Sequence, residues 1–182
     1  EQQCDIIVST GGVSVGDFDV VHTALAQIPD CTVEMNFWKV RMKPGKPVAA
    51  GLIQHNGKNI PLFALPGNPV SALMGFYQFV RPFLLKAMGH PQPNLPTLQL
   101  PLGQDIHKRG TRLEFVRCWL KEVDRTLQVF PTPNQSSAWM SSFSDASVLL
   151  PVAPECHHIP AGSIVTVQRL PKAATWPATW RT

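Results

Sequence analysis

The stretch Ile6-Ile7-Val8-Ser9-Thr10-Gly11-Gly12 decides the fold that we predict. Its first three residues are wholly apolar, which is typical of a strand buried in a parallel sheet. Thr10-Gly11-Gly12 then ends that strand. A helix is expected from about Asp19, because apolar residues recur on one face at Val20, Val21, Ala24, Leu25 and Ile28. The order of strand, glycine loop and helix predicts an α/β unit.

Three more strands are expected downstream. The first covers roughly Asn36–Met42. The other two, Val48–Ile53 and Ile60–Leu65, flank the turn-like sequence His55-Asn56-Gly57-Lys58 and form a hairpin or neighbouring strands. A long helix then runs from Pro69 to Met88.

The boundaries of that helix have local signals. Asn68 is a good N-cap, Pro69 suits the first helical position, and Gly89 is a typical C-terminal stop. Pro82 should kink the helix, because it removes a backbone donor.

The composition changes after Gly89. His90-Pro91-Gln92-Pro93-Asn94-Leu95-Pro96 is a proline-rich linker, and short alternating segments follow it. We therefore predict an α/β unit over residues 1–90, a small antiparallel β domain (sandwich or barrel) over 91–170, and a disordered tail over 171–182. The clearest β segments are Leu113–Val123, Thr126–Pro131, Ser147–Val152 and Ile164–Leu170.

Composition excludes several classes of function. No apolar run approaches the roughly 20 residues of a membrane span, and a net charge of +4 is too mild to indicate nucleic-acid binding. The four cysteines form no CxxC pair, which favours reduced thiols in the cytosol over a disulfide framework or a zinc site. Cys156-His157-His158 is a weak metal pattern, because adjacent strand residues point to opposite faces.

The glycine loop Thr10–Asp19 is the first candidate site. Gly11 and Gly12 let backbone N–H groups approach an anion beyond the carboxyl end of a strand. Asp17 and Asp19 add carboxylates of the kind that hold magnesium beside substrate phosphates. Both carboxylates are also compatible with simple helix capping.

The second candidate is Phe37-Trp38-Lys39-Val40-Arg41-Met42-Lys43-Pro44-Gly45-Lys46-Pro47. Period-two alternation predicts Lys39, Arg41 and Lys43 on one strand face. Pro44-Gly45 fits a type II turn that folds Lys46 back beside them. Four crowded cations indicate a receptor for a polyanion; a solvated edge strand is the alternative.

The third candidate is Leu65-Pro66-Gly67-Asn68-Pro69-Val70-Ser71-Ala72, where a strand leads into the long helix. The first turn of a helix has unpaired N–H groups that can bind an anion, although a well-capped helix needs no ligand. Together the three loops predict one anion site at a single edge of the sheet.

These segments resemble the molybdopterin molybdenumtransferase family, called MoeA in bacteria. TGGVSVGDFD, FWKVRMKPGKP and LPGNPVSA follow the order of that family, and two later motifs, GTRLEFVR and NQSS, resemble its C-terminal β domain. The resemblance implies half of a three-layer αβα molybdopterin-binding domain followed by that β domain. It also implies insertion of molybdenum from molybdate into adenylylated molybdopterin, with release of AMP and a requirement for Mg²⁺ or Zn²⁺.

The resemblance also implies the roles of individual residues. Asp19 matches an essential aspartate that binds the metal, and Ser14 lies in the same loop. Lys39, Lys43 and Lys46 match lysines that hold the pterin phosphates and molybdate. The remaining expected substrate contacts are Gly11, Gly12, Pro66, Gly67, Pro69, Ser137, and Arg112 or Arg117.

Members of the family are cytoplasmic homodimers with further N-terminal regions, so we expect this chain to be an inactive fragment of such an enzyme. Two alternatives remain open. One is molybdopterin adenylyltransferase, the preceding enzyme and a possible partner, which lacks the lysine segment and the β domain. The other is a gephyrin-like scaffold that clusters receptors. Neither nucleic acid nor a membrane is an expected partner.

Overall fold

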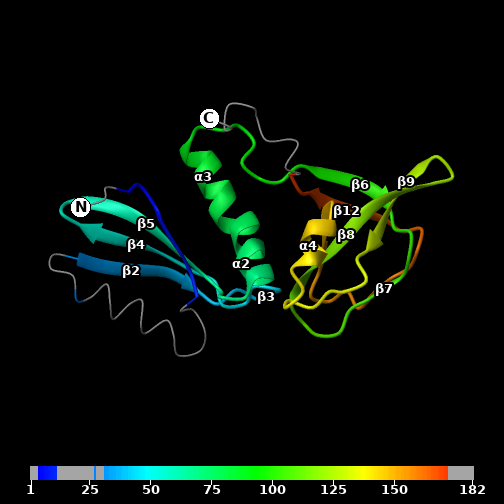
Figure 1. Cartoon of the computed structure of the whole chain (residues 1–182), viewed down its shortest axis with the longest axis horizontal. Coiled ribbons are helices and arrows are strands. Elements are labelled where there is room, and N and C mark those ends of the chain that lie inside the picture. Colours follow the sequence, from blue (N-terminus) through cyan, green and yellow to red (C-terminus); the bar gives the residue numbers. More distant parts are fainter. Residues whose placement is uncertain (1–3, 12–26, 28–30, 172–182) are drawn as a thin grey trace. The chain divides into compact units, whose positions relative to one another are not determined.

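Residues 4–11, 27 and 31–171 are described by a computed structural model, and Figure 1 shows their helices and strands. The chain divides into two units, Glu1–Asn94 and Leu95–Thr182, and the division falls inside the proline-rich segment 90–96. The helix expected from Asp19 lies outside the described residues, as does the predicted tail beyond Pro171. Among the described residues, no helix is both long and apolar enough to cross a membrane.

The described sheet of the first unit has the strand order β1-β5-β4-β2. β1 runs parallel to β5, whereas β4 is antiparallel to both of its neighbours. The predicted β4–β5 hairpin is confirmed, and Asn56 and Gly57 in its turn both have positive φ, +50° and +72°. This turn geometry matches the twist of the two strands. The strand bounds are β1 Ile7–Thr10, β2 Cys31–Trp38, β4 Ala49–His55 and β5 Lys58–Leu65.

The burial of β1 differs from the prediction. An apolar run predicts a strand buried on both faces, but residues of β1 alternate between half-buried and exposed, and Val8 is 42% exposed. In the described part of the chain β1 is the edge of its sheet. The apolar sequence therefore correctly predicted parallel pairing but not a central position.

The strand expected over Asn36–Met42 was placed too late in the sequence. β2 ends at Trp38, because Lys39 has φ +66° and turns the chain out of the extended conformation. The segment 39–48 is a loop that joins β2 to β4, and the two-residue strand β3, Met42–Lys43, lies within it. Backbone bonds from Lys39 N to Val48 O (3.0 Å) and from Val40 N to Lys46 O (2.9 Å) hold the loop together.

The turn inside this loop contains Pro44 and Gly45. The Lys43–Pro44 peptide is cis, and Gly45 has the positive φ, +99°, that the predicted turn requires of its second central residue. The predicted alternation of burial is observed, because Met42 is buried between exposed Arg41 and Lys43.

The long helix is confirmed as three consecutive segments, α2 Pro69–Gly75, the π-helical η1 Phe76–Val80, and α3 Arg81–Ala87. The wide π turn lies directly before Pro82, which has no N–H to donate to the preceding turn. Gly89 has φ +77° and donates to Lys86 O, while His90 donates to Leu85 O. These two bonds form the Schellman motif that ends a helix.

The helix packs closely on one face of the sheet (Figure 1). A Cβ added to Gly75 would lie 2.9 Å from Leu65 Cδ2 and 3.2 Å from Val48 Cγ2, so a larger residue would force these side chains to shift. Phe83 of α3 contacts Phe63 of β5 edge-on, with ring centroids 5.3 Å apart. The first unit is thus an α/β unit of a sheet with this helix on one face.

The second unit is an antiparallel β structure whose strands pair in the order β8-β10-β12-β6, with β9 also paired to β8. One parallel bridge, Leu102↔Val129, connects the segment after β6 to β9. This single isolated bridge does not close the sheet into a barrel, and the unit is sandwich-like. The strands span β6 Thr97–Pro101, β8 Leu113–Val123, β9 Thr126–Pro131, β10 Val148–Val152 and β12 Ile164–Arg169.

The four β segments predicted in this unit are all confirmed. Burial alternates clearly along β12, whereas β10 is apolar throughout and buried at four of its five residues. Four elements were not predicted: the strand β6, the short helix α4 Ser141–Asp145 and the two-residue strands β7 Ile106–His107 and β11 His158–Ile159. The core of the unit is aliphatic and contains Leu102, Ile106, Val116, Cys118, Val129, Val148, Leu150, Val152, Val165 and Val167.

Candidate anion site at the sheet edge of the first unit

The loops that follow β1 and β5 lie side by side. The two strands are parallel and pair from Ile7↔Leu62 to Thr10↔Leu65, so they end at the same edge of the sheet. Gly11 N donates to Leu65 O at 3.0 Å. A Cβ added to Gly67 would lie 3.5 Å from Gly11 Cα. The glycine loop and the LPGNP turn are therefore in backbone contact.

The loop 39–48 reaches the same edge from the other side of β5. β4 is antiparallel to β5 and begins at Ala49, which pairs with Ala64 near the carboxyl end of β5. A Cβ added to Gly45 would lie 2.7 Å from Met42 Cε and 3.3 Å from the carbonyl oxygen of Ser71 in α2. The loop thus packs on the first turn of the helix. Gly11, the turn after β5 and the loop 39–48 therefore lie at one edge of the sheet.

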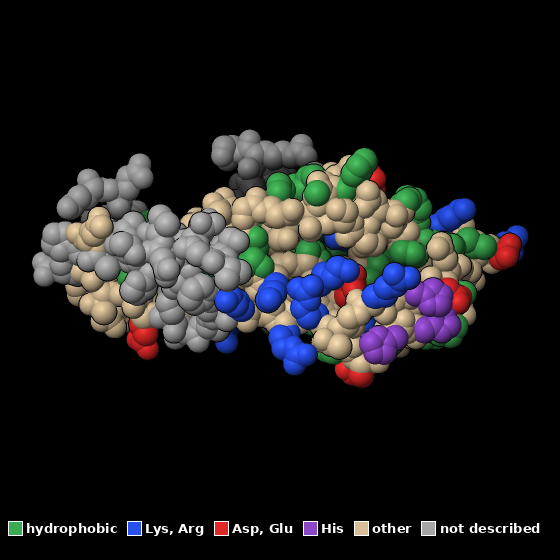
Figure 2. All heavy atoms as spheres, turned by 90° about the horizontal axis from the view of Figure 1, so that it is seen from below, with side chains coloured by type: hydrophobic (Ala, Val, Ile, Leu, Met, Phe, Trp, Pro, Cys, Tyr) green, Lys and Arg blue, Asp and Glu red, His purple; other side chains and the backbone are tan. Residues whose placement is uncertain are grey.

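The loop 39–48 gives this edge its positive charge. Lys39, Arg41, Lys43 and Lys46 are all exposed, and Figure 2 shows Lys and Arg side chains (blue) on one face of the molecule. The sequence contains no Asp or Glu between Glu34 and Asp105. Four cations so close together in the chain repel one another, and an anionic ligand would lower that repulsion.

The start of α2 is well capped. The Asn68 side chain accepts the N–H of Ser71 at 3.3 Å, and Ala72 N donates to Asn68 O at 2.8 Å. The cap therefore already satisfies part of the first turn, and Pro69 has no N–H to offer. Pro66 is buried, whereas Gly67 and Pro69 are exposed at the surface of the turn. Within the third candidate loop, a ligand can approach the exposed backbone of Gly67 most closely.

The structure describes Gly11 but not the rest of the glycine loop. Gly11 has φ +88°, and a Cβ added there would meet no atom of the described residues within 4 Å. The described part of the chain therefore leaves this backbone accessible. Gly12, Ser14, Asp17 and Asp19 lie outside the described residues.

Arg117 of the second unit corrects an expectation. We expected it or Arg112 to contact substrate, but Arg117 is 0% exposed. Its Nη2 donates to Ser136 O at 3.2 Å and to Asn134 O at 3.4 Å. Desolvation in this interior lowers the pKa of the guanidinium. Arg117 holds the 134–136 segment in place, and its burial prevents contact with a ligand.

The NQSS motif belongs to the same internal arrangement. Gln135 Nε2 donates to Arg117 O at 2.8 Å and to Thr132 O at 3.0 Å, while its Oε1 accepts Arg117 N at 3.0 Å. Ser137 follows this clamp and is exposed, and Arg112 is exposed as well. These two expected contact residues are thus accessible, whereas Arg117 is not.

Lys108 was missed by the sequence interpretation. It is 6% exposed, and its ammonium donates to three backbone carbonyls, those of Gly110 (3.2 Å), Arg112 (3.0 Å) and Pro154 (2.9 Å). These bonds fix the loop that leads to Arg112. No local signal distinguishes Lys108 from the neighbouring surface cations, because its partners come partly from a segment far along the chain.

Comparison with known protein families assigns both units. A family described as "Probable molybdopterin binding domain" matches residues 1–86, and the "MoeA C-terminal region (domain IV)" matches residues 99–170. The two matches define a class of proteins in which a molybdopterin-binding α/β domain is followed by this β domain. Together the matches confirm the resemblance to the MoeA family that is seen in the motifs of the chain.

Curated relatives agree. Molybdopterin molybdenumtransferase of Haemophilus influenzae is 33% identical over 171 residues, an alignment that covers 92% of this chain and 40% of the relative. Molybdopterin molybdenumtransferase 2 of Mycobacterium tuberculosis is also 33% identical, over 90% of this chain and 39% of its own length. Gephyrin of Dictyostelium discoideum is 35% identical over 90% of this chain and 25% of its own length. The chain therefore spans less than half of each of these relatives.

Solved structures show the same fold. The molybdopterin biosynthesis MoeA protein from Pyrococcus horikoshii has a TM-score of 0.68 at 27% identity and covers 91% of this chain and 37% of its own. A molybdenum cofactor biosynthesis protein from Pyrococcus furiosus has a TM-score of 0.65 at 21% identity, over 92% of this chain and 49% of its own. The latter likeness supports the fold alone.

Proposed function

We propose that this chain is part of an enzyme that inserts molybdenum from molybdate into adenylylated molybdopterin, with release of AMP. The observation that carries the proposal is the meeting of three loops at one sheet edge, one of them with four exposed cations. Relatives named molybdopterin molybdenumtransferase support the reaction. The match of the second unit to the MoeA C-terminal region favours molybdenum insertion over adenylyl transfer.

The proposed roles follow from the charges of the reactants. Molybdate is a dianion and the substrate contains a diphosphate linkage, so Lys39, Lys43 and Lys46 would hold them electrostatically. Gly45 anchors the loop on α2, and its proline neighbours Pro44 and Pro47 limit the motion of the lysines. A loop fixed before binding loses less conformational entropy when the ligand arrives.

The glycine loop would contribute the remaining half of the phosphate site. No described residue blocks a phosphate from approaching the backbone of Gly11 closely. We propose that Asp19 holds Mg²⁺ or Zn²⁺, that Ser14 acts in the same loop, and that Gly12 contacts the substrate. Such a metal, when bound, neutralises charge on the phosphoanhydride. Pro66, Gly67 and Pro69 would shape the neighbouring turn, and Arg112 and Ser137 are proposed molybdate contacts.

The context of the reaction is also proposed. The four cysteines are free thiols, as suits a reducing cytoplasm. We expect the whole protein to be a homodimer that receives its substrate from an adenylyltransferase. The chain spans 40% of the Haemophilus relative, and we expect no turnover by the chain alone.

The experiment replaces single lysines by glutamine in the whole enzyme. Lys43→Gln and Lys46→Gln should each slow molybdenum insertion and weaken binding of inorganic pyrophosphate roughly tenfold or more, because a charge pair at 4 Å near a protein surface contributes about 4 kcal/mol before desolvation. Lys58→Gln is the matched control: Lys58 is exposed at the start of β5, at the opposite end of the strand. Equal losses of activity and of pyrophosphate affinity in all three variants would refute the assignment of the loop 39–48 to the substrate site.

A further inference from the structure

A small ribbon in the second unit places three metal-binding side chains together. β7 and β11 pair antiparallel, with His107 directly opposite His158. Side chains of directly paired residues stand on the same face of a ribbon. Asp105 lies two positions before His107, which is the spacing that returns a side chain to the same face. Asp105, His107 and His158 are named here the ribbon cluster.

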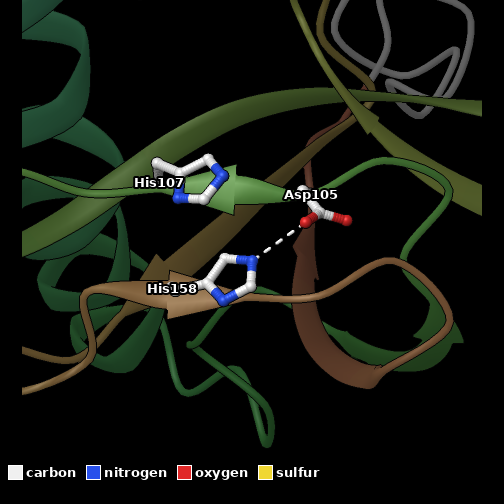
Figure 3. Close-up of side chains that lie close together, drawn as sticks. All are labelled: Asp105, His107 and His158. Atoms are coloured by element: carbon white, nitrogen blue, oxygen red, sulfur yellow. Dashed lines mark hydrogen bonds and ion pairs between the residues drawn. The ribbon is translucent and has the colours of Figure 1, made fainter.

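The side chains of the ribbon cluster converge. One possible ligand atom from each of Asp105, His107 and His158 lies within 4.8 Å of the other two. The imidazole rings of His107 and His158 stack with centroids 4.4 Å apart and planes 5° from parallel. His158 Nε2 lies 2.9 Å from Asp105 Oδ2. Figure 3 shows the two rings one above the other, with the Asp105 carboxylate beside them.

The carboxylate is already held in position from outside the cluster. The N–H of Ala161 donates to Asp105 Oδ1 at 2.8 Å, which leaves Oδ2 directed to His158. Carboxylates that bind metals commonly have such a bond on their other oxygen, because it fixes their orientation. The side chains of Asp105 and His158 remain 48% and 46% exposed, so an ion from solvent can reach them.

An ordinary surface ion pair is the simpler interpretation of these contacts. It accounts for Asp105 and His158, but it does not explain why a second imidazole stacks on the first. Two neutral imidazoles and one carboxylate form a donor set of net charge −1, which suits a divalent ion of the zinc type. A tetrahedral zinc ion with bonds of about 2.0–2.1 Å separates its ligand atoms by roughly 3.3 Å. The possible ligand atoms of the ribbon cluster lie within 4.8 Å of one another, and rotamer changes of these exposed side chains can bring them to the distance that zinc requires.

We propose that Asp105, His107 and His158 form a surface site for a divalent transition-metal ion, with water completing the coordination. The site is independent of the proposed function and uses none of the residues assigned to it. The ion would join the segment before β7 to the segment around β11, which are about 50 residues apart. Its binding would stabilise the folded second unit, because the unfolded chain does not hold the three ligands together.

Zinc binding to the tag-free full chain, measured by titration calorimetry with zinc chloride, tests the proposal. We expect one site per chain, weakened roughly tenfold or more in His107→Ala, His158→Ala and Asp105→Asn, since loss of even an outer-shell partner costs about 10–100-fold. His157→Ala is the matched control. This exposed histidine adjoins His158 but does not belong to the ribbon cluster, so the variant should keep the affinity of the unchanged chain.

Thermal unfolding provides a second readout that also shows whether the variants fold. Zinc should raise the Tm of the unchanged chain and of His157→Ala, and should not raise that of His107→Ala or His158→Ala. Zinc affinity and Tm shifts that are equal in His158→Ala and the unchanged chain would overturn the proposal. Absence of zinc binding by the unchanged chain would overturn it too.

Discussion

Gly45 connects the charged loop of the first unit to the helix. It has φ +99°, a conformation that residues with a Cβ rarely adopt. The missing Cβ also leaves room for Met42 Cε, which would otherwise lie at 2.7 Å, and for the Ser71 carbonyl oxygen at 3.3 Å. Two separate physical requirements, backbone conformation and space, thus act at one residue.

Comparison with Gly57 separates these two requirements. Gly57 also has a positive φ, +72°, but a Cβ added there would meet nothing within 4 Å. We expect Gly57→Ala to lower the free energy of unfolding by about 1 kcal/mol, from backbone strain alone. Gly45→Ala should cost clearly more, about 2–4 kcal/mol, because it adds overpacking. Urea denaturation of both variants measures the difference; equal losses would show that the loop adapts freely.

The buried cations could not be predicted from the sequence. Arg117 donates to carbonyl groups of the 134–136 segment, and Lys108 donates to Pro154 O. The 134–136 segment and Pro154 both lie outside the local windows from which strands and turns are predicted. The lysine loop was easier to interpret, because its four cations and two prolines fall within nine consecutive residues, 39–47.

At the scale of elements, the long helix was the most predictable part of the fold. Its start and end depend on local chemistry, the Asn68 cap and the Gly89 stop, and both are observed. The end of β2 was less predictable. Its alternation of polar and apolar residues continues past Trp38, and the positive φ of Lys39 has no local signature in a residue that is not glycine. The two-residue strands β7 and β11 are too short for any periodicity.

The Asn68 cap can be tested directly. Asn68→Ala removes the acceptor for Ser71 N–H and should lower the free energy of unfolding by about 1 kcal/mol. Asn68→Ser restores an acceptor and should recover most of that loss. Chemical denaturation of the three proteins gives the comparison. If Asn68→Ser is as unstable as Asn68→Ala, another property of Asn68 would be responsible.

At the scale of the whole molecule, the sequence predicted the order of most elements but not all of their pairings. The β4–β5 hairpin follows from its Asn56-Gly57 turn. The pairing of β1 with β5, with three other strands between them in the sequence, depends on packing across the unit. The candidate anion site depends on the pairing of β1 with β5. No single sequence motif therefore shows that its loops lie at one sheet edge.

The interior of the second unit predicts a pH dependence of stability. Burial raises the pKa of the Cys118 thiol from 9.0 to about 12. Between pH 9 and 12 the unfolded chain loses this proton while the folded chain keeps it, so the folded state becomes less stable as pH rises. Below pH 9 the thiol is protonated in both states, and its contribution is constant.

Cys118→Ser isolates this contribution, because a serine hydroxyl does not titrate in that range. Between pH 9 and 10.5, we expect the free energy of unfolding to fall by about 1–2 kcal/mol more in the unchanged chain than in Cys118→Ser. Urea denaturation at several pH values measures both slopes. Parallel curves for the two proteins would contradict the prediction, whatever their absolute stabilities.

The parallel pairing of β1 with β5 has a consequence for how the first unit assembles. Each paired residue of β1 joins a partner 55 positions later in the sequence, whereas β4 and β5 close across a two-residue turn. Loop closure entropy grows by about 0.6 kcal/mol for each doubling of length, so the longer closure is costlier by a few kcal/mol. The anion site includes the ends of both strands. A ligand bound there would therefore stabilise the contact of the first unit that is entropically hardest to form, and substrate affinity and assembly of the sheet would be thermodynamically linked.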